Sequence, residues 1–140
     1  MKPAYLLDTN VLVALLRGKA PHLRDKLAAH AGKIAVSTVS VMELQYGANL
    51  SDNPVGSRRR VSELLSLVQV LPFDEAAAKH TGFIRAALKQ AGTPICPFDS
   101  QIAGHARSRS LTVVTNNTRE FARVEGLAVT DWQADSPPVA

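Results

Sequence analysis

The N-terminal part of the chain changes from one hydrophobic pattern to another within a few residues. The run 4–7 is short and continuously apolar, which is typical of a buried strand, whereas 11–16 has the apolar spacing of a helix. Asp8, Thr9 and Asn10 separate the two segments. Asp8 is therefore predicted at the carboxyl end of a strand, where open α/β sheets place their ligand crevice.

Short apolar runs and amphipathic segments continue to alternate along the chain. We expect further strands at 34–36, 68–71, 111–114 and 127–129. Amphipathic spacing predicts helices at 21–31, 40–48, 58–68, 75–90, 97–108 and 118–123. The polar segment 51–56, which carries Pro54, is expected to be a loop or a helix break, and Asp74 is expected to cap the helix after it.

Strands that alternate with helices predict a parallel sheet covered on both faces. The expected fold class is α/β, a three-layer α/β/α arrangement with a central parallel sheet of four to five strands. We assign residues 1–133 to one domain and 134–140 to a disordered tail. No segment approaches the length of a membrane span, and Asp8 interrupts the only stretch that resembles a signal peptide, so we expect a cytoplasmic protein.

Composition and charge exclude only a few kinds of site and function. The chain of 140 residues is 46% hydrophobic and 20% charged, as in an ordinary globular domain. Its net charge of +4 permits nucleic-acid binding without requiring it. Cys96 is the only cysteine, which excludes an intrachain disulfide and a cysteine zinc cluster, and we expect it to be a buried thiol. The basic run Arg58–Arg60 is interpreted as a solvated helix face.

Acidic residues lie where several of the predicted helices open; they are Asp8, Glu43, Asp99 and Glu120. Because the carboxyl ends of parallel strands share one edge, these carboxylates are expected to converge on one crevice. Grouped carboxylates raise one another's pKa, and a divalent cation removes that cost. Ligands that are all oxygen favour Mg²⁺ or Mn²⁺ over zinc. Ions held in this way activate water and stabilise an in-line phosphoryl displacement.

Each acid also has a purely structural alternative, which spacing alone leaves open. These alternatives are N-caps at Asp8 or Asn10 and at Asp99, and capping boxes at Ser40-x-x-Glu43 and Asn117-x-x-Glu120. His105, near the same helix face as Asp99, is interpreted as a structural histidine. The glycine-rich patterns of dinucleotide-binding and P-loop proteins are absent from the sequence.

Several longer motifs are informative through the identity of their residues as well as through their spacing. In order, they are Tyr5-Leu6-Leu7-Asp8-Thr9-Asn10, Ser40-x-x-Glu43-Leu44-x-Tyr46-Gly47-Ala48, Pro97-Phe98-Asp99-x-x-Ile102-Ala103-Gly104-His105-Ala106, Val114-Thr115-Asn116-Asn117-Thr118-Arg119-Glu120-Phe121-x-Arg123-Val124 and Asp131-Trp132. In this order they closely resemble the VapC toxins, which are PIN-domain ribonucleases of type II toxin–antitoxin pairs. The resemblance runs from about residue 4 to residue 132, nearly the whole chain.

The resemblance implies a PIN-domain fold and an Mg²⁺-dependent endoribonuclease, with Mn²⁺ as a possible substitute. It also implies inhibition by a VapB-type antitoxin, contact with promoter DNA only through the antitoxin complex, and a homodimer. The stretch His80-Thr81-Gly82-x-Ile84-Arg85-Ala86, together with 115–121, looks most like the branch that cleaves initiator tRNA in its anticodon stem-loop. The RNA substrate is thus expected to be a tRNA.

Site residues follow from the same resemblance. Asp8, Glu43 and Asp99 match the metal-site acids of the family. Many PIN domains have an aspartate where this chain has Asn117, so Glu120 is the candidate for the last carboxylate, and Asn117 for an amide ligand or a holder of water. The other candidates, for positioning a water or a phosphate, are Thr9 and Thr115.

Two other hypotheses are held against the nuclease. The chain could be a non-catalytic partner-binding module that acts through antitoxin and promoter-DNA complexes. It could also be a small phosphatase that begins at Asp8-Thr9, but Asn10 replaces the second aspartate that such chemistry needs.

Overall fold

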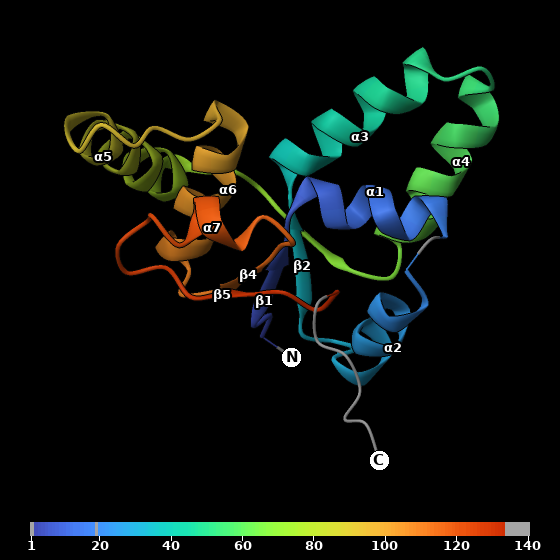
Figure 1. The fold of residues 1–140 in the computed structure, drawn as a ribbon. Coiled ribbons are helices and arrows are strands. Elements are labelled where there is room, and N and C mark those ends of the chain that lie inside the picture. The colour runs from blue at the N-terminus through green and yellow to red at the C-terminus, as the bar shows by residue number, and fades with distance from the viewer. Residues whose placement is uncertain (1, 19, 134–140) are drawn as a thin grey trace.

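The computed structural model describes residues 2–18 and 20–133 (Figure 1). Its strands are β1 (Tyr5–Leu7), β2 (Ile34–Ser37), β3 (Gln69–Leu71), β4 (Thr112–Val114) and β5 (Val129–Thr130). Its helices are α1 (Thr9–Arg17), α2 (Pro21–Ala29), α3 (Thr38–Leu50), α4 (Pro54–Leu65), α5 (Glu75–Gln90), α6 (Pro97–Ser108) and α7 (Thr118–Phe121). The predicted tail, 134–140, lies outside the described residues.

The strands form one parallel sheet in the order β3-β2-β1-β4-β5. Strand β1 lies at its centre, with Tyr5 opposite Ile34 on one side and opposite Thr112 on the other. Because all the strands run the same way, their carboxyl ends meet at one edge. The predicted central parallel sheet of four to five strands is confirmed, with five.

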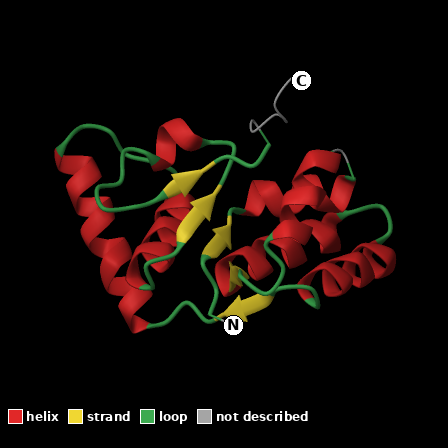
Figure 2. Cartoon of the chain, turned by 90° about the horizontal axis from the view of Figure 1, so that it is seen from below, coloured by secondary structure: helices red, strands yellow, loops and turns green. Residues whose placement is uncertain are grey.

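Successive side chains along the strands pack on opposite faces of the sheet, as the two-residue period of a strand requires. Leu6 lies in a core under α5, α6 and α7, whereas Leu7 lies in a core under α1, α2 and α4. Helices accordingly cover both sides of the strands (Figure 2). The predicted three-layer α/β/α arrangement is therefore confirmed, with one hydrophobic core between the sheet and each layer of helices.

Helix α3 joins the two halves of the molecule. Its first turn contributes Val39 to the core under α5 and α6, and its later turns contribute Leu44 and Ala48 to the opposite core. The helix begins two residues earlier than predicted because Ser37 caps it, accepting a hydrogen bond from the Val39 amide at 3.1 Å. This position at the sheet edge places α3 next to the carboxyl ends of the strands.

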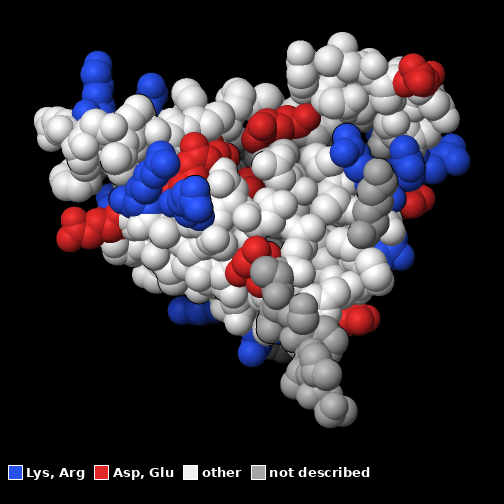
Figure 3. Space-filling view, in the orientation of Figure 1, with Lys and Arg blue, Asp and Glu red and all other residues white. Residues whose placement is uncertain are grey.

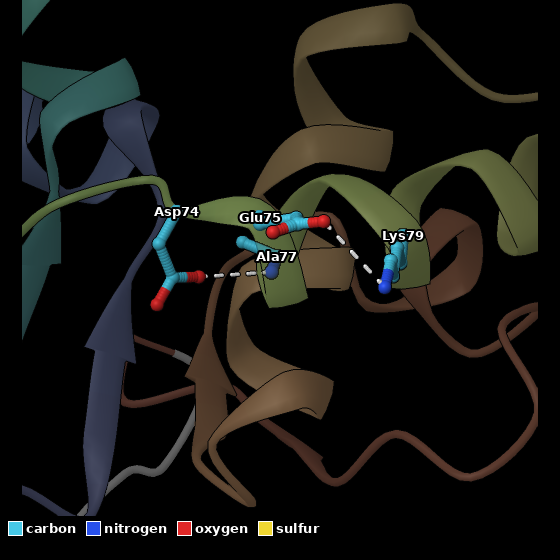
Figure 4. Close-up of polar contacts among 4 residues, drawn as sticks. All are labelled: Asp74, Glu75, Ala77 and Lys79. Carbon is cyan, nitrogen blue, oxygen red and sulfur yellow. Dashed lines mark hydrogen bonds and ion pairs between the residues drawn. The ribbon is translucent and has the colours of Figure 1, made fainter.

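Helix α5 has the N-cap that the sequence predicts. Oδ1 of Asp74 accepts a hydrogen bond from the Ala77 amide at 3.0 Å, which holds the pKa of Asp74 below its usual value (Figure 4). On the same helix, the exposed side chains of Glu75 and Lys79, which are one turn apart, form an ion pair at 3.6 Å (Figure 4). The cap satisfies an otherwise unpaired donor of the first turn and fixes where α5 starts.

Helices α5 and α6 touch closely where Gly104 faces Thr81. A Cβ atom at Gly104 would overlap Thr81 Oγ1 and lie 2.7 Å from the Thr81 amide nitrogen. The Thr81 hydroxyl is turned back into its own helix, where it donates to the Ala77 carbonyl at 2.8 Å. Only a glycine allows this approach, so the contact sets how α6 lies against α5.

Two sequence expectations need correction. Helix α4 already begins at Pro54 because Asn53 caps it, its Oδ1 accepting from the Gly56 amide at 3.1 Å. The predicted loop 51–56 is therefore shorter than expected.

Cys96 is exposed rather than buried, since it occupies the N-cap position of α6 in a segment whose neighbours are also mostly exposed. In the described part of the chain, no helix has the length and apolar character needed to cross a bilayer.

Candidate active site

Asp8 lies directly after β1 and is only 2% exposed. Its amide donates to the Val114 carbonyl at 2.9 Å, which continues the pairing between β1 and β4. Asp8 occupies the N-cap position of α1, but its side chain makes no capping hydrogen bond. Oδ2 instead accepts from the Thr115 hydroxyl at 2.8 Å. Burial raises the pKa of Asp8 above its usual value, although the bond from Thr115 acts in the opposite direction.

A chain of hydrogen bonds leads from Thr115 to Glu120. Thr115 Oγ1 accepts from the Asn117 backbone amide at 2.9 Å, and the Asn117 side chain donates through Nδ2 to Glu120 Oε2. The other oxygen, Oε1, accepts from the Cys96 amide at 3.3 Å. The Asn117 backbone amide is therefore bound by Thr115, not by Glu120, which excludes the capping box proposed for this pair. Asn117 orients the carboxylate of Glu120.

Glu43 projects from α3 and is held by Thr9 at the start of α1. The Thr9 hydroxyl donates to Glu43 Oε1 at 2.8 Å and lies 2.9 Å from Ser40 Oγ. The capping box Ser40-x-x-Glu43 is wrong, because Ser37 is the N-cap and Ser40 lies buried inside the helix. Sequence reasoning missed the role of Ser40 as a neighbour of Thr9. Its separation of three residues from Glu43, which puts both on one helix face, was the available signal.

Asp99 is the third residue of α6, two positions past the start at Pro97, so it is not an N-cap. The pKa of Asp99 is raised to about 7. Burial is the largest cause, and the charge of Asp8 and a hydrogen bond with Glu120 come next. The charges of Glu120 and Glu43 contribute in the same direction. The structure thus brings the four acids, which come from distant segments, into mutual electrostatic contact at the carboxyl edge of the sheet.

The surface around these acids has a distinct charge pattern. Acidic side chains gather where α1, α3, α6 and α7 come together, and Lys and Arg side chains lie on either side of them (Figure 3). An acidic centre between basic flanks repels a polyanion at its middle unless a cation is bound there. The same flanks attract the polyanion's neighbouring charges.

The donor set fits a hard divalent cation by its chemistry. Within residues 2–18 and 20–133, no three His, Cys, Asp or Glu side chains close around one point as a metal-binding group. Instead, Glu43 is turned toward the Thr9 hydroxyl and Glu120 toward the side-chain amide of Asn117. All the donors are nevertheless oxygens. The repulsion that adds to burial in raising the pKa of Asp99 is a cost that a divalent cation relieves.

His105 belongs to the core and not to the acidic centre, in agreement with its interpretation as structural. It is fully buried, and its Nδ1 lies 2.8 Å from Ser37 Oγ. Burial lowers the pKa of His105, which favours the neutral ring. Because Ser37 caps α3, this contact ties α6, which carries Asp99, to the start of α3, which carries Glu43.

Comparison with known proteins identifies the family of this chain. Residues 5–127 match the model of the PIN domain. The chain is 47% identical over 128 residues to the tRNA(fMet)-specific endonuclease VapC of Shigella flexneri, covering 91% of this chain and 97% of that protein.

Solved structures give the same result. DNA-bound VapBC from Salmonella typhimurium superposes with a TM-score of 0.90 at 42% identity, covering 93% of this chain and 98% of that one. VapBC2 from Rickettsia felis, bound to a DNA fragment from its promoter, gives a TM-score of 0.88 at 30% identity, with 94% and 99% covered.

Proposed function

This chain belongs to the VapC family of PIN-domain proteins, and we propose that it is a divalent-metal-dependent endoribonuclease toxin that cleaves initiator tRNA in the anticodon stem-loop. The resemblance inferred from sequence motifs is thereby confirmed at the level of the family. The observation that supports the activity best is the meeting of Asp8, Glu43, Asp99 and Glu120 at one edge of the sheet. The choice of tRNA rests on the name of the Shigella relative and on the motif around Arg85.

In this proposal Asp8, Glu43 and Asp99 hold the cation, which is Mg²⁺ with Mn²⁺ as a substitute, and Glu120 supplies the fourth carboxylate. When bound, the ion would activate water and neutralise charge on the scissile phosphate. The surrounding side chains orient the acids. Thr115 fixes Asp8 and Thr9 fixes Glu43, much as outer partners orient the ligands of other metal sites.

Asn117 has a different part in the same scheme. Its side-chain amide donates to Glu120, so it holds this carboxylate in place rather than replacing it. Glu120 in turn binds the Cys96 amide at the start of α6. The loop after β4 and the helix that carries Asp99 are therefore fixed relative to each other through Glu120.

A VapB-type antitoxin is the proposed partner, and promoter DNA is reached only through it. A groove of about 290 Å³ between α1, α3 and α4 offers a place for an antitoxin segment. Its apolar lining includes Leu16, Leu44 and Val61, and Glu43 and Arg17 also line it. A segment seated there would reach the acidic centre. The proposed RNA substrate fits the cytoplasmic location expected from the sequence, and the homodimer implied by the resemblance stays a prediction.

The test is cleavage of purified RNA by the purified chain. Initiator tRNA and total tRNA are incubated with the protein and Mg²⁺, or with a chelator, beside the Asp8→Asn variant. We expect cleavage of initiator tRNA that needs the metal and is lost in the variant. Cleavage of other RNA only would keep the nuclease and discard the tRNA substrate. Absence of cleavage by protein free of antitoxin would favour the non-catalytic partner-binding module.

A further inference from the structure

A second cavity, which has two cationic side chains in its lining, lies between α5 and the segment that leads into α6. Its volume is about 350 Å³. The residues that matter here are Arg85, Lys89, Leu88, Pro94, Ile95 and Ser100. The two cationic side chains come from successive turns of α5, four residues apart, so they stand on one face of that helix.

The cations of this cavity are available to a ligand. Arg85 and Lys89 are both exposed, and neither forms an ion pair with any carboxylate of the described residues. Arg123 adds a third positive charge at the rim, where its Nη1 donates to the Pro94 carbonyl at 3.3 Å. Three unneutralised cations around one concavity attract an anion with more than one charge.

The cavity is fixed relative to the acids by the covalent chain and by helix packing. Ile95 and Ser100 line it, and Asp99 lies between them in sequence, directly before Ser100. The close contact of Gly104 with Thr81 holds α6 against α5, one turn before Arg85. A strand of nucleic acid with its scissile phosphate at Asp99 would therefore pass the cavity with a neighbouring phosphate.

We propose that this cavity, the Arg85–Lys89 cavity, is a subsite for a backbone phosphate of the RNA substrate on one side of the cleaved bond. The inference rests on the proposed nuclease function and deepens it by assigning where the RNA strand runs. A repeating polyanion is favoured over a single small anion because Asp99 of the proposed catalytic centre directly precedes Ser100 of the cavity lining. Contacts of this kind position the strand and do not depend on its sequence.

The test compares two variants that remove the same charge from opposite edges of the sheet. The cavity variant, Arg85→Ala/Lys89→Ala, removes the two cationic side chains that line the cavity. The control variant, Lys2→Ala/Lys33→Ala, removes two exposed lysines that precede β1 and β2 at the amino edge. Binding of labelled initiator tRNA and of an unrelated single-stranded RNA is measured by fluorescence anisotropy over a range of salt concentrations. Cleavage of the same tRNA by the unmodified chain and by each variant is measured in parallel.

We expect the cavity variant to bind both RNAs at least tenfold more weakly, and its salt slope to fall by about one for each phosphate that it no longer binds. Arg85→Lys should keep the slope, and the control variant should match the unmodified protein. All variants should unfold at the same temperature, because the mutated side chains are exposed. For cleavage, KM should rise while kcat changes little.

Each outcome decides between the two proposals. Equal RNA binding by the cavity variant and the control would overturn the subsite, even if the unmodified chain cleaves tRNA. Loss of binding to an antitoxin, with RNA binding kept, would assign the cavity to an acidic peptide and also overturn it. Loss of RNA binding in the cavity variant, from a chain that cleaves nothing, would support the RNA path and reject the nuclease.

Discussion

The Thr115 hydroxyl donates a hydrogen bond of 2.8 Å to Oδ2 of Asp8, joining side chains 107 positions apart in the sequence. Thr115 Oγ1 also accepts from the Asn117 backbone amide. One buried hydroxyl, as donor and as acceptor, thus connects the acid after β1 with the loop after β4. The orientation of Asp8 is set by the neutral side chain of Thr115.

Replacing Thr115 by valine should separate this orienting role from simple packing. Valine keeps the shape but leaves Asp8 without its donor. We expect a loss of about 10–100-fold in RNA cleavage, as for other residues that orient metal ligands. The free energy of unfolding should fall by about 1–3 kcal/mol, because the partly buried amide of Asn117 loses its acceptor and the buried Asp8 its donor. Thr115→Ser is the control, and an equal loss in both variants would contradict the role of the hydroxyl.

The stability of the metal-free protein should decrease as pH rises. The pKa of Asp99 is about 7 in the folded chain against 3.8 in the unfolded one, so the folded state binds more protons between these values. Stability then falls with pH from about 4 to about 7 and levels off above that. Urea unfolding in chelator at pH 5 and pH 7.5 measures this. Asp99→Asn should flatten the dependence, and a slope that survives in it would assign the effect to other groups.

Asp8→Asn should affect activity and stability in opposite directions. Removing the buried charge relieves the burial cost that raises the pKa of Asp8, so the metal-free variant should be at least as stable as the parent at pH 7.5. Added Mg²⁺ should raise the melting temperature of the parent, since a ligand that binds only the folded state stabilises it. The variant should show neither this rise nor RNA cleavage. A matching rise in the variant would place the cation elsewhere.

Gly104→Ala should disrupt the crossing of α5 and α6. The new methyl group would overlap Thr81, including its backbone, so a helix must move. We expect a loss of about 1–3 kcal/mol in the free energy of unfolding, as for other overpacked interiors. Gly82→Ala on α5 is the matched control, because nothing lies within 4 Å of its Cβ position. Alanine favours the helix there by about 0.5–1 kcal/mol. Equal effects at both glycines would argue against a tight crossing.

The fold could be predicted from sequence because its strands are short apolar runs and its helices are amphipathic. The position of Asp8 followed from the rule that ligands bind at the carboxyl ends of parallel strands. The residues that cap the helices were harder to predict from the sequence. Ser40 has the spacing of a cap, yet Ser37 takes that role because β2 runs directly into α3.

The convergence of the four acids could be predicted, but the individual hydrogen bonds between distant segments could not. Nothing near Thr115 in the chain indicates Asp8 as its partner, and the pairing exists only because β1 and β4 are neighbours in the sheet. The apolar neighbour Ile95 favours an interior position for Cys96, but the turn into α6 exposes it. Short apolar stretches next to a proline are poor guides to burial.

The order of the strands in the sheet bears on when the protein becomes active during its own synthesis. Strand β1 is made first, but it is flanked by β4, and Asp99, Thr115 and Glu120 are all encoded in the last third of the chain. A nascent chain that has reached only α5 carries Asp8 and Glu43 without the residues that complete their surroundings. Ribosome-bound intermediates and prematurely terminated products should therefore be harmless to the RNA around them. The complete acidic centre therefore forms only after the segment from α6 to α7 has been synthesised.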